Sequence, residues 1–183
     1  HKNIIAISGS LRAQSFNGSL LKAVKTLAPE SLTIEIVDIS NIPLYNQDLE
    51  KDFPANFPKA VQDLKDKIMA SDGVIFATPE YNRSVPGVLK NVIDWASRPY
   101  GKNAFAGKPV LVLGVTVGQI GTAVAQYHLK QILLCLDMHV IGQPEFYLGG
   151  ATSKFDAEGN LTDQSTKNHI VEALEVLERH TSH

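Results

Sequence analysis

Short apolar runs alternate with amphipathic stretches along the chain, and no internal repeat interrupts this order. The runs rich in Ile, Val, Leu and Phe predict strands at 4–7, 32–36, 73–77, 109–114, 138–141 and 146–148. The third and fourth runs are almost entirely apolar, which is typical of strands covered on both faces. The second run alternates apolar and polar positions, which indicates one drier face.

The stretches between these runs place apolar residues at helical spacing. One such face is formed by Leu20, Leu21, Val24 and Leu27. Pro29 ends that helix, because proline lacks the N–H that a helix interior needs. Further helices are predicted to end near Ser71, Ala96, Leu136 and His180. Residues 39–57 and 149–163 show no period and are predicted to be polar loops.

Strands that alternate with helices predict an α/β fold whose parallel sheet is covered on both faces, with right-handed crossovers. Five strands in a chain of 183 residues fit the flavodoxin-like three-layer sandwich, with strand order 2-1-3-4-5, better than the six-stranded dinucleotide fold. We expect a single domain over residues 1–183. Ligands of such sheets bind beyond the carboxyl ends of the strands, which directs attention to the turns there.

The composition gives no indication that the protein binds nucleic acid or a membrane. Seventeen Lys and Arg stand against nineteen Asp and Glu, so no basic excess predicts binding to nucleic acid or to anionic lipid. The apolar runs are too short to span a bilayer, and no leader segment is recognised, so a cytoplasmic protein is expected. The carboxylates of Asp48, Glu50 and Asp52 are expected to be solvated.

Metal and thiol chemistry find little support in the sequence. Cys135 is the one cysteine, which excludes a disulfide framework or an iron–sulfur site within one chain, and it is expected in the core. No H-x-x-x-H pair occurs among the six histidines, so no metal site is expected.

The turn after the first strand is rich in hydroxyl groups. It consists of Ser8-Gly9-Ser10-Leu11-Arg12-Ala13-Gln14-Ser15-Phe16-Asn17. Backbone N–H groups and the positive end of a helix dipole attract an anion there. Ser10, Ser15 and Asn17 add donors, and Arg12 adds a forked, charged one. The turn therefore predicts a site for a terminal monophosphate. Ordinary helix capping, which also favours Ser and Asn, is the alternative.

The turn after the third strand is stiffened by two prolines. It consists of Thr78-Pro79-Glu80-Tyr81-Asn82-Arg83-Ser84-Val85-Pro86-Gly87. Pro86 suits the first position of the helix that follows. Tyr81 is placed to lie against a flat ring, and the backbone of 80–82 to meet ring carbonyls and nitrogens. The alternative is a rigid turn with Tyr81 packed in the core.

Several common motifs are missing. The chain has no G-x-x-x-x-G-K-[ST] loop for a nucleoside triphosphate and no G-x-G-x-x-G loop for a pyrophosphate. It has no G-x-S-x-G elbow for a serine hydrolase either. The absence of the two phosphate loops favours a ligand with a single phosphate.

Two segments together resemble a known family. They are Gly-Ser-Leu-Arg-x-x-Ser-Phe-Asn at 9–17 and Pro-Glu-Tyr-Asn-x-Ser-x-Pro-Gly-x-Leu-Lys-Asn-x-Ile-Asp-Trp at 79–95. In order and spacing they resemble the NAD(P)H-dependent FMN reductases, and within them the chromate or quinone reductases. The resemblance extends over about residues 3–180.

The resemblance implies noncovalent FMN and the residues that hold it. The phosphate turn would supply Ser10, Arg12, Ser15, Phe16 and Asn17. The edge of the flavin ring would lie along Pro79, Glu80, Tyr81 and Asn82. A third contact would come from Thr116 and Gly118, where the family usually has Ser-x-Gly. No catalytic side chain is expected.

The resemblance also implies a ping-pong reaction. NADPH or NADH, which the sequence does not distinguish, would pass hydride from C4 to flavin N5 and leave. Quinones, azo or nitro compounds, metal oxyanions such as chromate, and free flavin are all suitable acceptors. A homodimer or homotetramer is expected. Val124 stands where many members carry an Arg that joins positions matching Tyr127 and Glu145 at a subunit contact.

Two other functions remain open on this fold. A flavodoxin-type electron carrier would bind FMN without enzymatic turnover, although such carriers are commonly strongly acidic and this chain has a net charge of −2. A small-molecule sensor would bind no flavin. The fold alone does not decide among them.

Overall fold

The computed structural model describes residues 1–182. Its strands are β1 (Lys2–Ser8), β2 (Leu32–Val37), β3 (Gly73–Ala77), β4 (Pro109–Val115), β5 (His139–Val140) and β6 (Tyr147–Leu148). Its α-helices are α1 (Phe16–Leu27), α2 (Lys59–Ala70), α3 (Gly87–Ala96), α4 (Ala123–Cys135) and α5 (Gln164–His180). The short 3-10 helices are η1 (Gln47–Glu50) and η2 (Ala151–Ser153). The predicted strands and helices are thus confirmed, and the regular structure of the expected loops is limited to the short 3-10 turns and an isolated β-bridge between Phe155 and Leu161.

The sheet has the predicted flavodoxin-like order, β2-β1-β3-β4-β5, with every pair parallel. The edge next to β4 is divided between two short strands. β5 pairs with the start of β4 through Pro109 and Val110, and β6 pairs with its end through Gly114 and Val115. The intervening residues 141–146 leave the sheet. As a result, β6 lies beside the carboxyl end of β4, where the third predicted contact begins.

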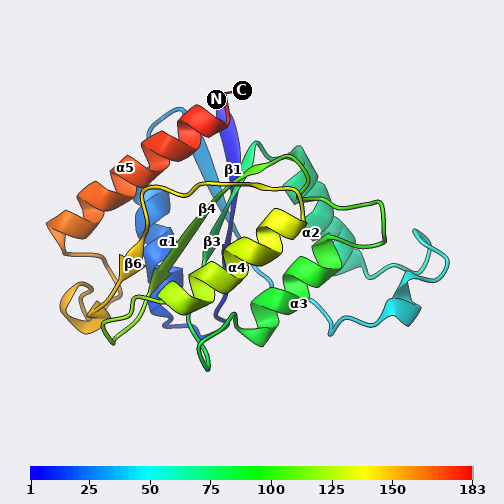
Figure 1. Cartoon of the computed structure of the whole chain (residues 1–183), viewed down its shortest axis with the longest axis horizontal. Coiled ribbons are helices and arrows are strands. Elements are labelled where there is room, and N and C mark those ends of the chain that lie inside the picture. Colours follow the sequence, from blue (N-terminus) through cyan, green and yellow to red (C-terminus); the bar gives the residue numbers. More distant parts are fainter. Residues whose placement is uncertain (183) are drawn as a thin grey trace.

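Helices cover both faces of the sheet, which makes the three layers that the sequence predicts (Figure 1). Alternate strand residues point to opposite sides. Ile4, Ile75 and Leu111 pack with α1 and α5, whereas Ile5 and Val74 pack with α2, α3 and α4. Two apolar cores therefore hold the central strands rigidly. Among residues 1–182, no helix has both the length and the apolar character that crossing a bilayer requires.

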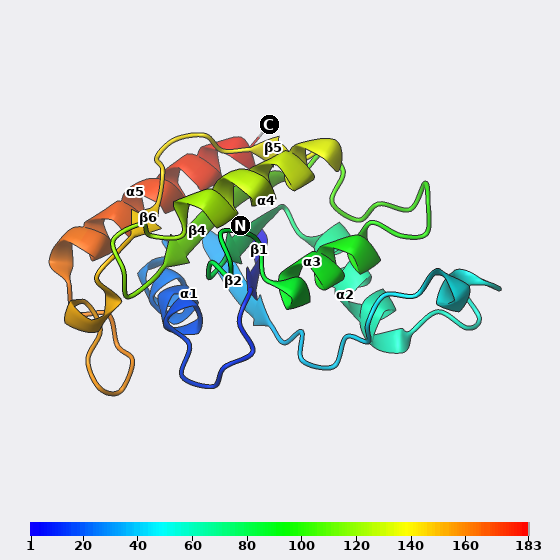
Figure 2. The same cartoon turned by 60° about the horizontal axis from the view of Figure 1, so that its bottom comes forward.

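The segment between β2 and α2 extends away from the layers (Figures 1 and 2). The carboxylates of Asp48, Glu50 and Asp52 in this segment were expected to be solvated, but Glu50 is engaged by two side chains. Its carboxylate accepts from Arg98 Nε at 2.8 Å and from Tyr45 Oη at 2.6 Å. The hydrogen bond from Arg98 is the main cause that lowers the pKa of Glu50. The prediction was wrong for Glu50 and holds for Asp48 and Asp52, which are exposed.

Cys135 is exposed, so its expected place in the core was wrong. The reason lies in α4, which carries apolar residues around most of its circumference. Its buried face is made by Ala125, Leu129 and Leu133, whereas Leu134 is 63% exposed beside Cys135. A helix without a clear polar face gives the sequence no signal for which side is buried.

Candidate functional site

Three turns meet at the carboxyl end of the sheet, along the lower edge of Figure 1. They follow β1, β3 and β4, as the strand order predicts for a ligand site. Of the predicted site residues, all but Asn82 and Gly118 line one hollow of about 170 Å³. Val115 and Val117, which the sequence analysis did not select, complete the lining. The fold thus brings residues from distant parts of the chain to one place.

The first turn presents donors at the start of α1. Ser15 caps this helix, since its Oγ accepts from Gly18 N at 3.4 Å, so Asn17 does not serve as the cap. The backbone N–H groups of Phe16 and Asn17 have no acceptor among residues 1–182. Such free groups at a helix start attract anions. Arg12 lines the same hollow.

The side chain of Asn17 was expected to donate to a phosphate, but it has a structural role. The side chain is buried, and its Nδ2 donates to Val115 O at 3.1 Å while its Oδ1 accepts from Val115 N at 3.0 Å. The end of β4 therefore engages both the nitrogen and the oxygen of the side-chain amide. Asn17 ties the first turn to the third, and its backbone N–H is the donor that it offers to a phosphate at the start of α1.

The second turn is tight and bent. Tyr81 and Ser84 exchange backbone hydrogen bonds of 3.2 and 3.0 Å. The residues between them, Asn82 and Arg83, have φ of 51° and 62°, the left-handed region that side chains other than glycine seldom adopt. Tyr81 is 49% exposed, so the alternative that it packs in the core is wrong. Pro86 precedes α3 as its N-cap rather than occupying its first position.

Glu80 turns its carboxylate away from solvent and toward α4. Its Oε2 accepts from Ala125 N at 3.0 Å, and its Oε1 accepts from Arg83 Nη1 at 3.3 Å. The Glu80 side chain is only 10% exposed. Because the carboxylate is engaged at α4, its backbone is the part of Glu80 left for a ligand edge.

The third turn is held by a segment that the sequence analysis passed over. Thr116 N donates to Leu148 O at 2.9 Å, and Ala151 N donates to Thr116 O at 3.1 Å. Gly150 N donates to Gly118 O at 3.0 Å. The residues after β6 therefore fix the backbone of 116–118. The paired glycines Gly149-Gly150 are the sequence signal, since a Cβ on Gly149 would lie 2.8 Å from Gly118 O.

The hollow suits a ligand with one phosphate and a flat apolar ring. Arg12 and free N–H groups mark one end, and no carboxylate points to them from the first turn. A neighbouring hollow of about 270 Å³ shares three lining residues with it and is more apolar, being lined by Gly9, Ser10, Leu11, Arg12, Tyr81, Pro86, Gly87 and Val88. The residues present therefore fit FMN, whose phosphate needs donors and whose ring needs apolar cover.

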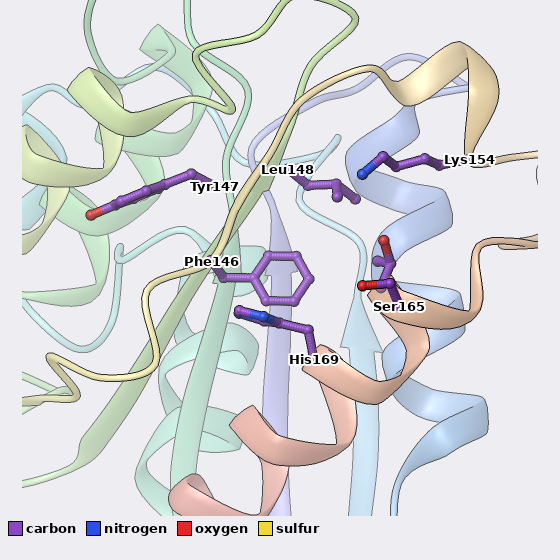
Figure 3. Close-up of a pocket in the computed structure, with 7 residues that line it drawn as sticks. Phe146, Tyr147, Leu148, Lys154, Ser165 and His169 are labelled. Atoms are coloured by element: carbon purple, nitrogen blue, oxygen red, sulfur yellow. The ribbon is translucent and has the colours of Figure 1, made fainter.

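Other hollows are less suited to such a ligand. One of about 570 Å³ also includes Arg12 and Phe16, but the carboxylates of Asp156 and Glu158 line it too and offset the positive charge of Arg12 and Lys22. A smaller one, of about 190 Å³, lies between β6 and α5 (Figure 3). In it, the His169 ring packs edge-on against Phe146, and its Nε2 hydrogen-bonds to Glu145 O at 2.8 Å. The Tyr147 side chain points away from this hollow (Figure 3). No group of three or more potential metal ligands occurs in the described part of the chain.

Known proteins are similar to this chain along most of its length. The family model described as NADPH-dependent FMN reductase matches residues 2–153. The chain is 46% identical over 175 residues to an NAD(P)H-dependent FMN reductase of Pseudomonas aeruginosa, covering 96% of this chain and 92% of the relative. It is 44% identical over 167 residues to a 2-hydroxy-1,4-benzoquinone reductase of a Burkholderia species, covering 91% and 89%.

A solved structure has the same fold. It is that of FerB, a flavoenzyme NAD(P)H:(acceptor) oxidoreductase from Paracoccus denitrificans. The TM-score is 0.87 at 40% identity, and the match covers 98% of this chain and 99% of FerB.

Proposed function

The chain belongs to the NADPH-dependent FMN reductase family and is thus an FMN-dependent NAD(P)H oxidoreductase; we propose that the hollow between its three turns holds the FMN and that quinones are its electron acceptors. The observation that carries the proposal is the meeting of the three turns around one hollow, with free donors at its α1 end. The relative named as a benzoquinone reductase supports the choice of acceptor. Azo and nitro compounds, chromate and free flavin are further candidates.

The residues of the hollow have binding and orienting roles. Bound FMN supplies a ring that takes hydride from NAD(P)H and gives two electrons to an acceptor. Arg12, Ser10, Ser15 and the N–H of Asn17 hold the phosphate by charge-assisted hydrogen bonds. The backbone of Pro79–Asn82 and of Thr116–Gly118 orients the ring edge. Backbone donors there stabilise negative charge on the reduced ring, so no catalytic side chain is required.

An absorbance titration tests this function. The protein is purified with FMN, and NADPH is added without oxygen. We expect the visible flavin band to bleach, and then rapid NADPH oxidation when 1,4-benzoquinone is supplied. Protein that takes up no FMN would contradict the cofactor assignment. FMN-bound protein that NADPH does not bleach would favour the electron carrier, which has no turnover without a partner enzyme. Flavin that bleaches but is not reoxidised by the quinone would contradict quinones as the acceptors.

Assembly and location are part of the proposal. The hollow is open to solvent, and α4 exposes Tyr127 and Leu134 at 57% and 63%. These features support a homodimer or homotetramer, in which a second subunit covers apolar surface. The cytoplasmic location is proposed from the sequence alone. Light scattering of the purified protein gives the mass of the assembly, and a monomer at micromolar concentration would contradict this part.

A further inference from the structure

The start of α4 is capped by a residue far away in the chain. Its N-cap residue, Thr122, has φ of 63° and makes no capping hydrogen bond with its side chain. Helix starts ordinarily take such a bond from the N-cap residue itself. Here the N–H of Ala125, in the first turn of α4, donates to the carboxylate of Glu80, 45 residues earlier. A carboxylate is also favoured there by the helix dipole.

Glu80 belongs to the turn that would meet the flavin ring. Tyr81 follows it directly and closes the turn by backbone hydrogen bonds with Ser84. The two residues between them, Asn82 and Arg83, have left-handed backbone conformations. Backbone of this kind persists only where its surroundings hold it. The nearly buried Glu80 carboxylate is one of the groups that fix this backbone, through its hydrogen bond with α4.

A second contact ties the same turn to the same helix. Ser84 Oγ lies 3.0 Å from Nδ1 of His128, one turn further along α4. This contact is exposed, whereas that of Glu80 is sheltered. The two contacts bracket the left-handed residues, so the position of α4 determines the shape of the turn. Of the two, the sheltered charge-assisted bond of Glu80 is the stronger.

We propose that Glu80 is a positioning residue: its carboxylate holds the turn at 79–84 against the start of α4 in the shape that receives the flavin ring, without itself contacting the ring. This inference rests on the proposed function, because the ring is that of FMN. A turn already held in its binding shape loses less conformational entropy when the ligand binds. The apo-protein therefore contains a preformed ring site.

FMN titration of apo-protein, followed by quenching of flavin fluorescence, tests the proposal. Glu80→Gln keeps an oxygen that accepts from Ala125 N, so its Kd should stay within about threefold of wild type. Glu80→Ala removes the bond, and its Kd should rise by about tenfold or more, the loss expected for a helix cap. Arg83→Ala is the matched control, since it removes the exposed partner of Glu80 and leaves the bond to Ala125.

Hydrogen exchange of the apo-protein gives a readout that does not depend on FMN. Glu80→Ala should speed exchange at Ala125 N and at Tyr81 and Ser84, whose N–H groups close the turn. Glu80→Gln should exchange there like wild type. If Glu80→Ala does not fold, Glu80→Asp takes its place, because its shorter carboxylate cannot reach Ala125 without moving the turn.

The outcomes separate three accounts. Equal Kd for wild type and Glu80→Ala would overturn the positioning role. A Glu80→Gln protein that binds FMN as weakly as Glu80→Ala, with a shifted flavin spectrum, would also overturn it, by showing direct contact with the ring. Wild-type protein that binds no FMN at all would refute the proposed function instead, and exchange at Ala125 would still report on the contact.

Discussion

Arg12 is the one positively charged side chain among the described residues that line the hollow. If it donates to the phosphate, Arg12→Ala should weaken FMN binding by about 1.5–3 kcal/mol, which is the worth of a hydrogen bond to a charged group. Lys25→Ala, an equal change of charge at the other end of α1, should leave the Kd unchanged. Isothermal titration with FMN measures both. Unchanged affinity in Arg12→Ala would remove this residue from the site.

Asn17 acts on the protein before any ligand is present. Asn17→Ala leaves the buried N–H and C=O of Val115 without their partner, so we expect a loss of about 2–4 kcal/mol in the free energy of unfolding. Urea unfolding of the apo-protein measures it. Asn168→Ala, on the surface of α5, is the control and should cost less than about 0.5 kcal/mol. An equally small loss in Asn17→Ala would show that the bridge to β4 is weak.

Where β4 approaches the start of α4, only glycine fits. A Cβ on Gly114 would lie 1.8 Å from Thr122 Oγ1 and 2.8 Å from Thr78 O. Gly114→Ala must therefore separate the strand from the helix, and we expect it to lower the free energy of unfolding by at least about 3 kcal/mol. Gly142→Ala is the control, because its Cβ would meet nothing within 4 Å. Thermal unfolding that does not distinguish the two variants would contradict the packing described here.

Lys65 joins α2 to the end of α3. It is 2% exposed, and its amine donates to the carbonyl oxygens of Ala96, Arg98 and Lys102. Burial lowers the pKa of Lys65 from 10.5 to about 8. Between these values the unfolded chain binds the proton that the folded protein has released, so this group makes stability rise with pH.

The stability of a Lys65 variant at several pH values tests whether Lys65 makes stability rise with pH. The free energy of unfolding of wild type, minus that of Lys65→Met, should rise from pH 8 to pH 10.5 and be level below pH 8. Taking the difference cancels the other groups that titrate in both proteins. Denaturant unfolding at several pH values gives the curve. A difference that falls or stays level across this window would show that the Lys65 amine remains protonated in the fold.

The elements were predictable because central strands of a parallel sheet are covered on both faces and stand out as unbroken apolar runs. The chain shows this at 73–77 and 109–114, and even the divided edge strand left two apolar pieces. Periodicity failed at α4, where apolar residues on both faces hid the exposure of Cys135. Local pattern tells which residues are apolar, and on such a helix it does not tell which side the sheet covers.

At the scale of the molecule, the predicted turns did converge, since their place at strand ends follows from the topology. What holds them together was not predictable. The bridge from Asn17 to Val115 spans 98 residues, and that from Glu80 to Ala125 spans 45. The ion pair of Glu50 with Arg98 spans 48. Such contacts depend on side-chain directions in the finished fold, which no short window of sequence contains.

A crystal structure of the protein with FMN tests the central claim most directly. We predict the phosphate at the start of α1, within hydrogen-bond reach of Ser10, Arg12 and Ser15, and the ring along Pro79–Asn82 and Thr116–Gly118. FMN bound in another hollow, or this hollow filled by the chain's own side chains while FMN is present, would contradict the account.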